Sequence, residues 1–218
     1  IQVHPDDIYA REKQLGNFGK MEAWYVLRSD DGRVASGLKA GIDKQALVAA
    51  VESGKVEDAV EFLPVSEGDI VYLRPGSVHA LCRGVMVYEV QQSSSITFRL
   101  YDYKRPDADG NLRELHIDQS LDVINFGDPA IVPAPVSGTT AVESEHFILE
   151  QFTIEATHQH EARDSFCCLT VIAGSAEVGS DDVSAHLELA ETVVVPANRA
   201  FKVNPLEPTT YLISSVPT

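Results

Sequence analysis

Four residues early in the chain carry side chains that bind metal ions: Gln2, His4, Glu22 and His79. In an extended strand, Gln2 and His4 would point to the same face because side chains alternate with a period of two. His79 follows a Pro-Gly turn at the start of a strand, where a small barrel would direct it inward. Two imidazoles, a carboxylate and an amide oxygen suit zinc with one position left open, as a catalytic site requires. Since a single strand histidine is more often a surface or core residue, the metal-site hypothesis rests on the four together.

Three charged residues could assist such a metal: Lys20, Glu89 and Arg99. Lys20 shares a strand face with Glu22, and the other two lie on the following strands. Strand lysines and arginines usually face solvent, but the register of these residues with the ligands favours the interior. A buried lysine beside a divalent cation would lose its proton more readily, which suits proton transfer or phosphate contact.

Short alternating stretches must position these residues. Most are separated by Gly, Pro, Asp or Asn, and many short strands with frequent turn signals favour an antiparallel sandwich or barrel, the class of jelly rolls and cupins. The sequence therefore predicts a mainly β protein with strands at 21–27, 69–73, 85–91, 96–103, 147–154, 166–173, 191–195 and 210–214.

Helical signals concentrate in an insertion at about 42–63. Asp43 can cap a segment with apolar residues on one face, and Gly54 stops it. A second short helical turn is expected from Val56 until Pro64 ends it. Another short helix is expected from Asp118 to Ile124.

The Pro-rich and Gly-rich stretch at 127–140 predicts a linker between a catalytic metal-binding unit at 1–126 and a C-terminal β unit at 141–218. Residues 68–79 align without gaps on 190–201, which indicates two cupin (jelly-roll) barrels in tandem.

The second unit has its own HxH pair, His158 and His160, followed by Asp164. However, Phe201 stands at the position equivalent to His79. We therefore expect no second metal here, and a unit that packs against the catalytic barrel and stabilises it.

Charge and cysteine content narrow the class of protein. The net charge of -16 disfavours binding to nucleic acid and to anionic membranes, so an anionic substrate must be held by a few local cations. Three cysteines, of which two are adjacent, favour a reducing cytoplasmic compartment. The chain shows no basic apolar leader and no apolar run near the roughly 18 residues of a spanning helix. A monomer and a homodimer both remain open.

Several motifs closely resemble type I mannose-6-phosphate isomerases of the bacterial kind: IQVHPDD at 1–7, GKMEAWYV at 19–26, PGSVHA at 75–80, EVQQSSSITFRLYDY at 89–103 and RELHIDQSLDVI at 113–124. The likeness covers essentially all of 1–126 and is looser over 127–218. It implies a cupin fold and the interconversion of mannose 6-phosphate and fructose 6-phosphate, small sugar phosphates, through a cis-enediol.

The resemblance also implies residue roles. The family's zinc ligands fall on Gln2, His4, Glu22 and His79, although the glutamine is sometimes not counted in the shorter bacterial enzymes. The family's essential arginine falls on Arg99, its active-site lysine on Lys20, and the carboxylate ten residues before the arginine on Glu89. Family members carry a substantial segment before the QVHP motif, so we expect a native N-terminal segment to be missing from this sequence.

Two rival functions remain. The first is a non-catalytic cupin that binds a sugar phosphate as a sensor or regulator, although binding alone would not need the whole set of ligands and charged residues. The second is another metal-dependent cupin enzyme, such as an iron oxygenase, because the fold does not fix the function. The FRLYDY and GKMEAWY runs favour the isomerase.

Overall fold

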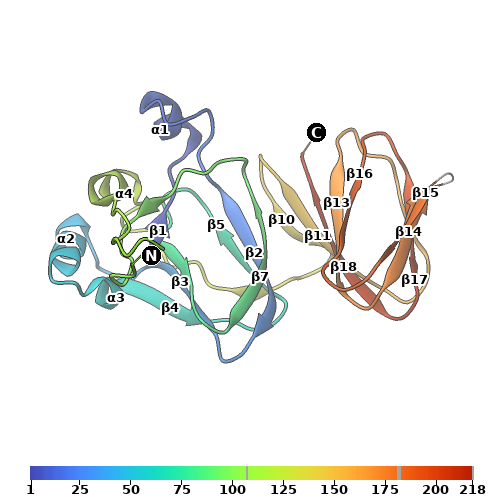
Figure 1. Ribbon diagram of the computed structural model, residues 1–218, viewed down its shortest axis with the longest axis horizontal. Coiled ribbons are helices and arrows are strands. Elements are labelled where there is room, and N and C mark those ends of the chain that lie inside the picture. The colour runs from blue at the N-terminus through green and yellow to red at the C-terminus, as the bar shows by residue number, and fades with distance from the viewer. Residues whose placement is uncertain (107, 181–182, 218) are drawn as a thin grey trace. The chain divides into compact units, whose positions relative to one another are not determined.

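The computed structural model describes residues 1–106, 108–180 and 183–217, and the chain divides into two compact units (Figure 1). The first unit is Ile1–Pro135 and the second is Val136–Thr218. Every strand pairing is antiparallel, and each unit contains two sheets. The predicted class, mainly β with cupin-like units in tandem and a small helical insertion, is confirmed.

The first unit is a sandwich of two antiparallel sheets. One has the order β4-β3-β6-β1-β8 and the other β7-β2-β5-β9. The first of these sheets is formed by β1 (Gln2–Val3), β3 (Arg33–Leu38), β4 (Val60–Pro64), β6 (His79–Leu81) and β8 (Phe98–Arg99). The second is formed by β2 (Glu22–Ser29), β5 (Asp69–Leu73), β7 (Val85–Gln91) and β9 (Ala134–Pro135).

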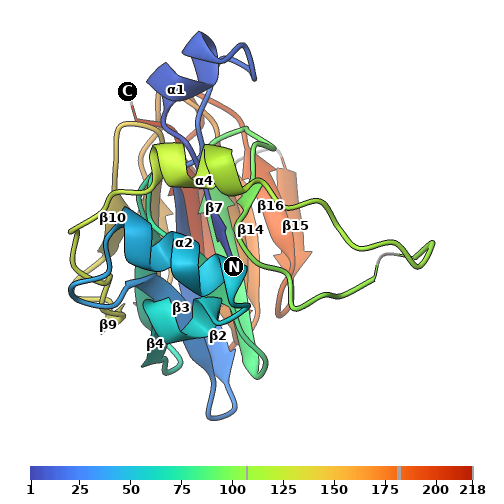
Figure 2. The ribbon, with the colours of Figure 1, turned by 90° about the vertical axis from the view of Figure 1, so that its left-hand side faces the viewer.

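Two apolar clusters hold the first unit together, one on each face of the sheet that contains β3. Val34 packs with Trp24 and Val71 between the two sheets. Its neighbour Ala35, on the opposite face, packs with residues of helices α2 (Lys44–Glu52), α3 (Val56–Ala59) and α4 (Ile117–Val123). Figure 2 shows α2 and α4 in front of this sheet. The helices therefore seal the outer face, and the space between the sheets is left for the polar residues discussed below.

The helical insertion begins as the sequence predicts. The Asp43 side chain accepts a hydrogen bond from the Ala46 amide at 2.8 Å, and Gly54 just beyond the helix adopts φ +70°. The expected helix near 118–124 is also confirmed, one residue earlier. The prediction that the second helical turn runs on to Pro64 is wrong: Val60–Pro64 form strand β4, where the pairing of Val34 with Leu63 and Ala35 with Phe62 overrides the weak helical signal.

Two further segments differ from the expectation. Helix α1 (Asp7–Glu12) lies outside the insertion, and its signal is Asp6, whose side chain accepts a hydrogen bond from the Tyr9 amide at 2.7 Å. The strand expected over 96–103 is limited to Phe98–Arg99, because its pairing partner is the two-residue strand β1 (Gln2–Val3). The chain turns at Tyr103 and Lys104, both in the left-handed region at φ 53°.

The second unit is also built from two sheets. The first has the order β10-β11-β18-β13-β16, with β10 (Thr140–Glu143), β11 (Ile148–Ile154), β13 (Cys167–Ala173), β16 (Thr192–Val195) and β18 (Thr209–Ser215). The other has the order β12-β17-β14-β15, with β12 (His158–His160), β14 (Ala176–Ser180), β15 (Val183–Leu187) and β17 (Phe201–Pro205). Phe201 opens β17 as His79 opens β6, which agrees with the internal alignment.

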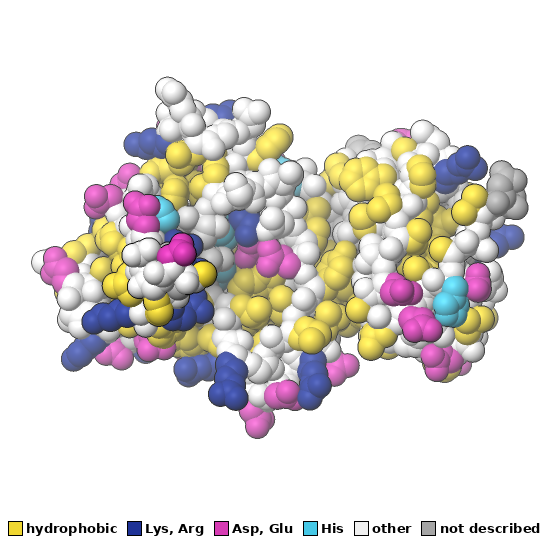
Figure 3. All heavy atoms as spheres, in the orientation of Figure 1, with side chains coloured by type: hydrophobic (Ala, Val, Ile, Leu, Met, Phe, Trp, Pro, Cys, Tyr) yellow, Lys and Arg dark blue, Asp and Glu magenta, His cyan; other side chains and the backbone are white. Residues whose placement is uncertain are grey.

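The surface carries charged side chains of both signs (Figure 3). On the face seen in Figure 3, basic side chains lie among acidic ones rather than in a continuous tract. Within the described residues, no helix has both the length and the apolar character needed to cross a membrane.

Replacing Leu47 by Ala should destabilise the first unit by about 3 kcal/mol, because this fully buried side chain anchors α2 to the sheet and its loss leaves a cavity. Trp24 is the only tryptophan in the sequence, so its fluorescence during urea unfolding reports on this unit. The exposed Gln45→Ala change in the same helix is the control and should shift stability by less than about 0.5 kcal/mol. Equal shifts for both variants would contradict the packing described here.

Candidate functional site

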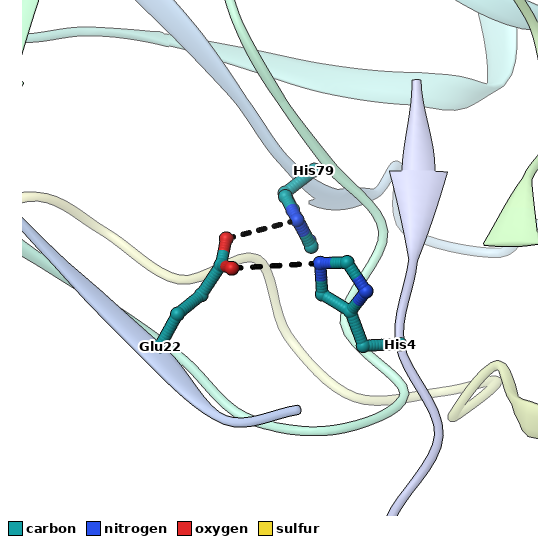
Figure 4. A group of neighbouring side chains, drawn as sticks. All are labelled: His4, Glu22 and His79. Carbon is teal, nitrogen blue, oxygen red and sulfur yellow. Dashed lines mark ion pairs between the residues drawn. The ribbon is translucent and has the colours of Figure 1, made fainter. Parts of the chain in front are cut away.

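Three metal-binding side chains converge between the two sheets of the first unit: His4, Glu22 and His79 (Figure 4). Their ligand atoms lie within 4.8 Å of one another. Nε2 of His79 is 3.1 Å from Oε1 of Glu22, and Nε2 of His4 is 3.5 Å from Oε2 of the same carboxylate. All three residues are at most 2% exposed. The structure thus brings together residues that are up to 75 positions apart in the sequence, since His4 precedes His79 by that number.

Strand pairing explains the convergence. Gln2 of β1 lies opposite His79 of β6 in the same sheet, and His4 follows directly after β1. Glu22 is the first residue of β2 in the facing sheet. Since Val3 belongs to the cluster beneath the helices, Gln2 and His4 on either side of it point into the space between the sheets.

Backbone carbonyls orient both imidazoles. Nδ1 of His4 donates a hydrogen bond to the Ile96 carbonyl at 2.8 Å, and Nδ1 of His79 donates to the Ser77 carbonyl at 2.9 Å. In the neutral ring, a protonated Nδ1 leaves the Nε2 lone pair free. Burial, together with the charges of His79 and Lys20, lowers the pKa of His4, which keeps that ring neutral. Both Nε2 atoms could therefore bind a metal, because the carbonyls fix the orientation of each ring through its other nitrogen.

Gln2 joins the same centre. Its Nε2 lies 3.1 Å from Nε2 of His79 and 3.4 Å from Nε2 of His4. The amide oxygen of this side chain is the atom that would bind a cation. All four ligand candidates named from the sequence are thus gathered at one place.

The donor set fits a metal ion. Burial acts to raise the pKa of Glu22, but contacts with His4 and His79 outweigh it and hold the pKa below its usual range. Neither carboxylate oxygen of Glu22 accepts a regular hydrogen bond within the described chain, although both are buried. An imidazole that also carries a proton on Nε2 donates to this carboxylate and lowers its pKa, whereas a ring protonated only on Nδ1 turns its Nε2 lone pair towards it. In the second case a cation between the three groups would satisfy their lone pairs. Four N and O donors of this kind suit a divalent transition metal.

Lys20 and Glu89 adjoin this centre. Nζ of Lys20 lies 2.7 Å from Oε2 of Glu22 and 3.7 Å from Oε1 of Glu89. Trp24 donates a hydrogen bond from Nε1 to Oε2 of Glu89 at 3.1 Å, and its ring meets His79 edge-on. Lys20 is 9% exposed, whereas the Glu89 side chain is 38% exposed. A buried ammonium therefore connects the metal-binding carboxylate to a second carboxylate that solvent can reach.

Arg99 lies at the edge of the group. It is paired with Gln2 between β8 and β1, so the two side chains share a face of the sheet. Its Nη1 donates to the Glu114 carbonyl at 2.8 Å, and its own amide donates to Nδ1 of His116 at 3.1 Å. The arginine is half-buried and is held by the segment that leads into α4 rather than by the ligands themselves.

In the second unit, the HxH pair has different neighbours. Nε2 of His160 lies 2.9 Å from the Tyr211 hydroxyl, and the ring stacks on Phe201 with centroids 4.7 Å apart. Asp164 is exposed. Within the described residues, the only metal-binding group of three or more His, Cys, Asp and Glu side chains is the one in the first unit.

Several known proteins are similar to this chain in sequence or in fold. No family model matches the chain. A mannose-6-phosphate isomerase of Streptococcus mutans is 36% identical over 185 residues, which are 82% of this chain and 58% of that protein. Mannose-6-phosphate isomerase ManA of Bacillus subtilis is 31% identical over 206 residues, which are 90% of this chain and 64% of that protein.

A crystal structure of the mannose 6-phosphate isomerase from Bacillus subtilis matches with a TM-score of 0.85 and 29% identity, over 99% of this chain and 71% of that one. The chain is a homologue of mannose-6-phosphate isomerases. A phosphomannose isomerase structure from Salmonella typhimurium, 13% identical with a TM-score of 0.70, shares the fold. The chain spans between 58% and 65% of the length of its curated mannose-6-phosphate isomerase relatives.

Replacing His79 by Ala should lower affinity for a divalent metal by more than the 10–100-fold typical of second-shell changes, because a direct ligand is lost. Metal content after dialysis, measured by inductively coupled plasma mass spectrometry, should fall from about one ion per chain to a trace. The control is His186→Ala, at an exposed histidine of the second unit, which should retain the metal. Equal metal content in the two variants would contradict the site.

Stability of the second unit should fall as the pH drops from about 6.5 towards 4. Burial, with the charges of His158 and Arg163, lowers the pKa of His160 to about 4, whereas an unfolded chain binds this proton near pH 6.5. Between pH 6.5 and about 4, the unfolded state therefore binds one more proton than the folded state. The free energy of unfolding consequently decreases as the pH falls through this range. In calorimetry, His160→Gln should show a smaller decrease in transition midpoint between neutral and acidic pH than the wild type. A His146→Gln control should behave like the wild type.

Proposed function

We propose that this chain forms part of a zinc-dependent isomerase that interconverts mannose 6-phosphate and fructose 6-phosphate through a cis-enediol. The observation that carries the proposal is the convergence of Gln2, His4, Glu22 and His79 beside the Lys20–Glu89 pair. Similarity to mannose-6-phosphate isomerases over at least 82% of the chain supplies the substrate and reaction class. All three cysteines are free thiols, which supports the proposed cytoplasmic location. A monomer and a homodimer both remain open.

Zinc suits the proposed site best. Two imidazoles, one carboxylate and one amide oxygen are donors that zinc accepts, and a catalytic zinc site leaves a position open for substrate. When bound, zinc would act as a Lewis acid that polarises the oxygens of the sugar. The chain's own contribution is a dry, preoriented set of donors, with His4 and His79 fixed by carbonyls.

Lys20 and Glu89 are the groups proposed to move the proton. Isomerisation transfers a proton between C1 and C2 of the sugar, so it needs a group that removes a proton and returns one. Lys20 lies deep beside Glu22, and Glu89 lies beside Lys20 with an exposed edge towards solvent. A proton could thus be held at Nζ of Lys20 or at Oε1 of Glu89. Either group can serve as the base.

Arg99 is proposed to balance negative charge. Its side chain shares a sheet face with Gln2, next to the ligands, and the Glu114 carbonyl fixes its guanidinium. A fixed guanidinium suits either the developing enediolate or the phosphate of the substrate. In a chain of net charge -16, such a local cation is needed to hold an anionic sugar phosphate.

A coupled assay on the full-length protein tests the proposal. Conversion of mannose 6-phosphate to fructose 6-phosphate should disappear on treatment with a chelator and return with Zn²⁺. Binding of the sugar phosphate without turnover would indicate a sensor. Restoration by Fe²⁺ with consumption of oxygen would indicate an oxygenase, and either result would overturn the isomerase.

Lys20→Met and Glu89→Gln should each lower kcat by about 10²–10⁴-fold, the contribution typical of a proton-transferring side chain. KM should change less if the two groups act mainly on the transition state. Lys13→Met, at an exposed lysine beyond α1, is the matched control and should keep wild-type kcat. If Lys20→Met keeps full activity with its metal bound, Lys20 does not transfer the proton.

A further inference from the structure

Lys20 is buried although it lies outside any strand. It precedes β2 by two residues, and its side chain nevertheless reaches Glu22 at 2.7 Å. Its own amide donates a hydrogen bond to the Pro5 carbonyl at 3.0 Å. Holding a lysine side chain in one place costs rotamer entropy, so the backbone that carries Lys20 must be well fixed.

Gln92 provides much of that fixation. Its Oε1 accepts a hydrogen bond from the Met21 amide at 2.8 Å, and its backbone amide donates to the Met21 carbonyl at 3.0 Å. Its Nε2 donates to Oδ1 of Asp7 at 3.0 Å, and the same oxygen accepts from the Gly19 amide at 2.7 Å. Gln92 is 6% exposed. A single amide–carboxylate pair therefore holds the peptide groups on both sides of Lys20.

Gly19 shows how closely these segments pack. A Cβ added at this position would lie 2.3 Å from the Pro5 carbonyl oxygen and 2.3 Å from the carbonyl carbon of Asp6. The segment after His4 therefore rests directly on the backbone before Lys20. The metal ligand and the lysine are thus placed relative to each other by backbone contact, and the Asp7–Gln92 pair closes this contact.

We infer that Gln92, together with Asp7, positions Lys20 for the reaction. This inference rests on the proposed isomerase function, because it assigns Lys20 a chemical role. The hydrogen bonds of this pair join the two side chains to each other and to the amides of Gly19 and Met21, so the pair acts on the segment that carries Lys20. A displacement of about 1 Å at a reacting group can lower a rate by about 10²-fold.

Activity provides the first test. In the full-length protein, Gln92→Met should lower kcat by about 10²-fold, with KM changed less than about 3-fold and the zinc content unchanged. Gln119→Met, at an exposed glutamine of α4, is the matched control and should behave like the wild type. An active wild type whose kcat is unaffected by Gln92→Met would overturn the inference, whereas an inactive wild type would overturn the proposed function.

A double-mutant cycle distinguishes a coupled pair from two independent residues. Gln92→Met removes the donor of the hydrogen bond to Oδ1 of Asp7, and Asp7→Ala removes its acceptor. We expect each single variant to lose at least about 10-fold in kcat and the double variant to lose little more than the larger of the two single losses. Additive losses in the double variant would contradict the pair.

Chemical labelling tests the inference without activity. Acetylation followed by mass spectrometry should modify Lys20 at least about 10-fold more slowly than exposed Lys13 in the wild type, because Lys20 is only 9% exposed. In Gln92→Met this protection should fall to about 3-fold or less, while the Trp24 unfolding midpoint still shows a folded first unit. Unchanged protection of Lys20 would overturn the inference whether or not the enzyme is active.

Discussion

The first unit is organised around one unfavourable group, the buried carboxylate of Glu22. Taken out of water, an ionised carboxylate costs several kcal/mol unless it is paired. The structure places Nζ of Lys20 at 2.7 Å and the Nε2 atoms of His79 and His4 at 3.1 and 3.5 Å. The lysine forms an ion pair with one carboxylate oxygen, whereas the imidazoles turn their Nε2 lone pairs towards the carboxylate when their protons lie on Nδ1 and bind backbone carbonyls. A cation bound between the carboxylate and the two imidazoles would satisfy these lone pairs, and we propose this as the physical reason for the site.

The sandwich supplies what that arrangement needs. Its two sheets bring Glu22 from one side and His4 and His79 from the other, while helices α2, α3 and α4 cover the outer face of the sheet that contains β3 with apolar residues. The two residues of β1 point to opposite faces of the sheet: Val3 packs beneath the helices, whereas Gln2 faces the candidate metal-binding residues. Strands hold or directly precede the candidate ligands. Lys20 instead lies in the less regular segment at 13–20, so its position depends on the Asp7–Gln92 pair.

The two units show how one topology can lead to different interiors. His79 opens β6 in the first unit and Phe201 opens β17 in the second, after equivalent turns. The aromatic ring stacks on His160 and the Tyr211 hydroxyl occupies the other side of that histidine, so the interior of the second unit is filled by packed rings. A single change from an imidazole to a phenyl ring removes a ligand and supplies packing area in its place.

Residue types and their spacing were enough to predict the β class, the cap at Asp43, and the candidate ligands Gln2, His4, Glu22 and His79, because alternation, capping and ligand chemistry are local properties of residue type. The roles of these candidates, and those of Lys20, Glu89 and Arg99, remain proposals. Other features emerge only in the folded chain: Val60–Pro64 is a strand, Arg99 is anchored to the Glu114 carbonyl, and Gln92 and Asp7 flank Lys20. The hydrogen bonds join residues that lie 15 to 85 positions apart in the sequence. Strand β4 forms because it pairs with β3. No local pattern encodes such partners. Folding buries these backbone and side-chain groups, and each buried polar group must then find a hydrogen-bond partner nearby in space.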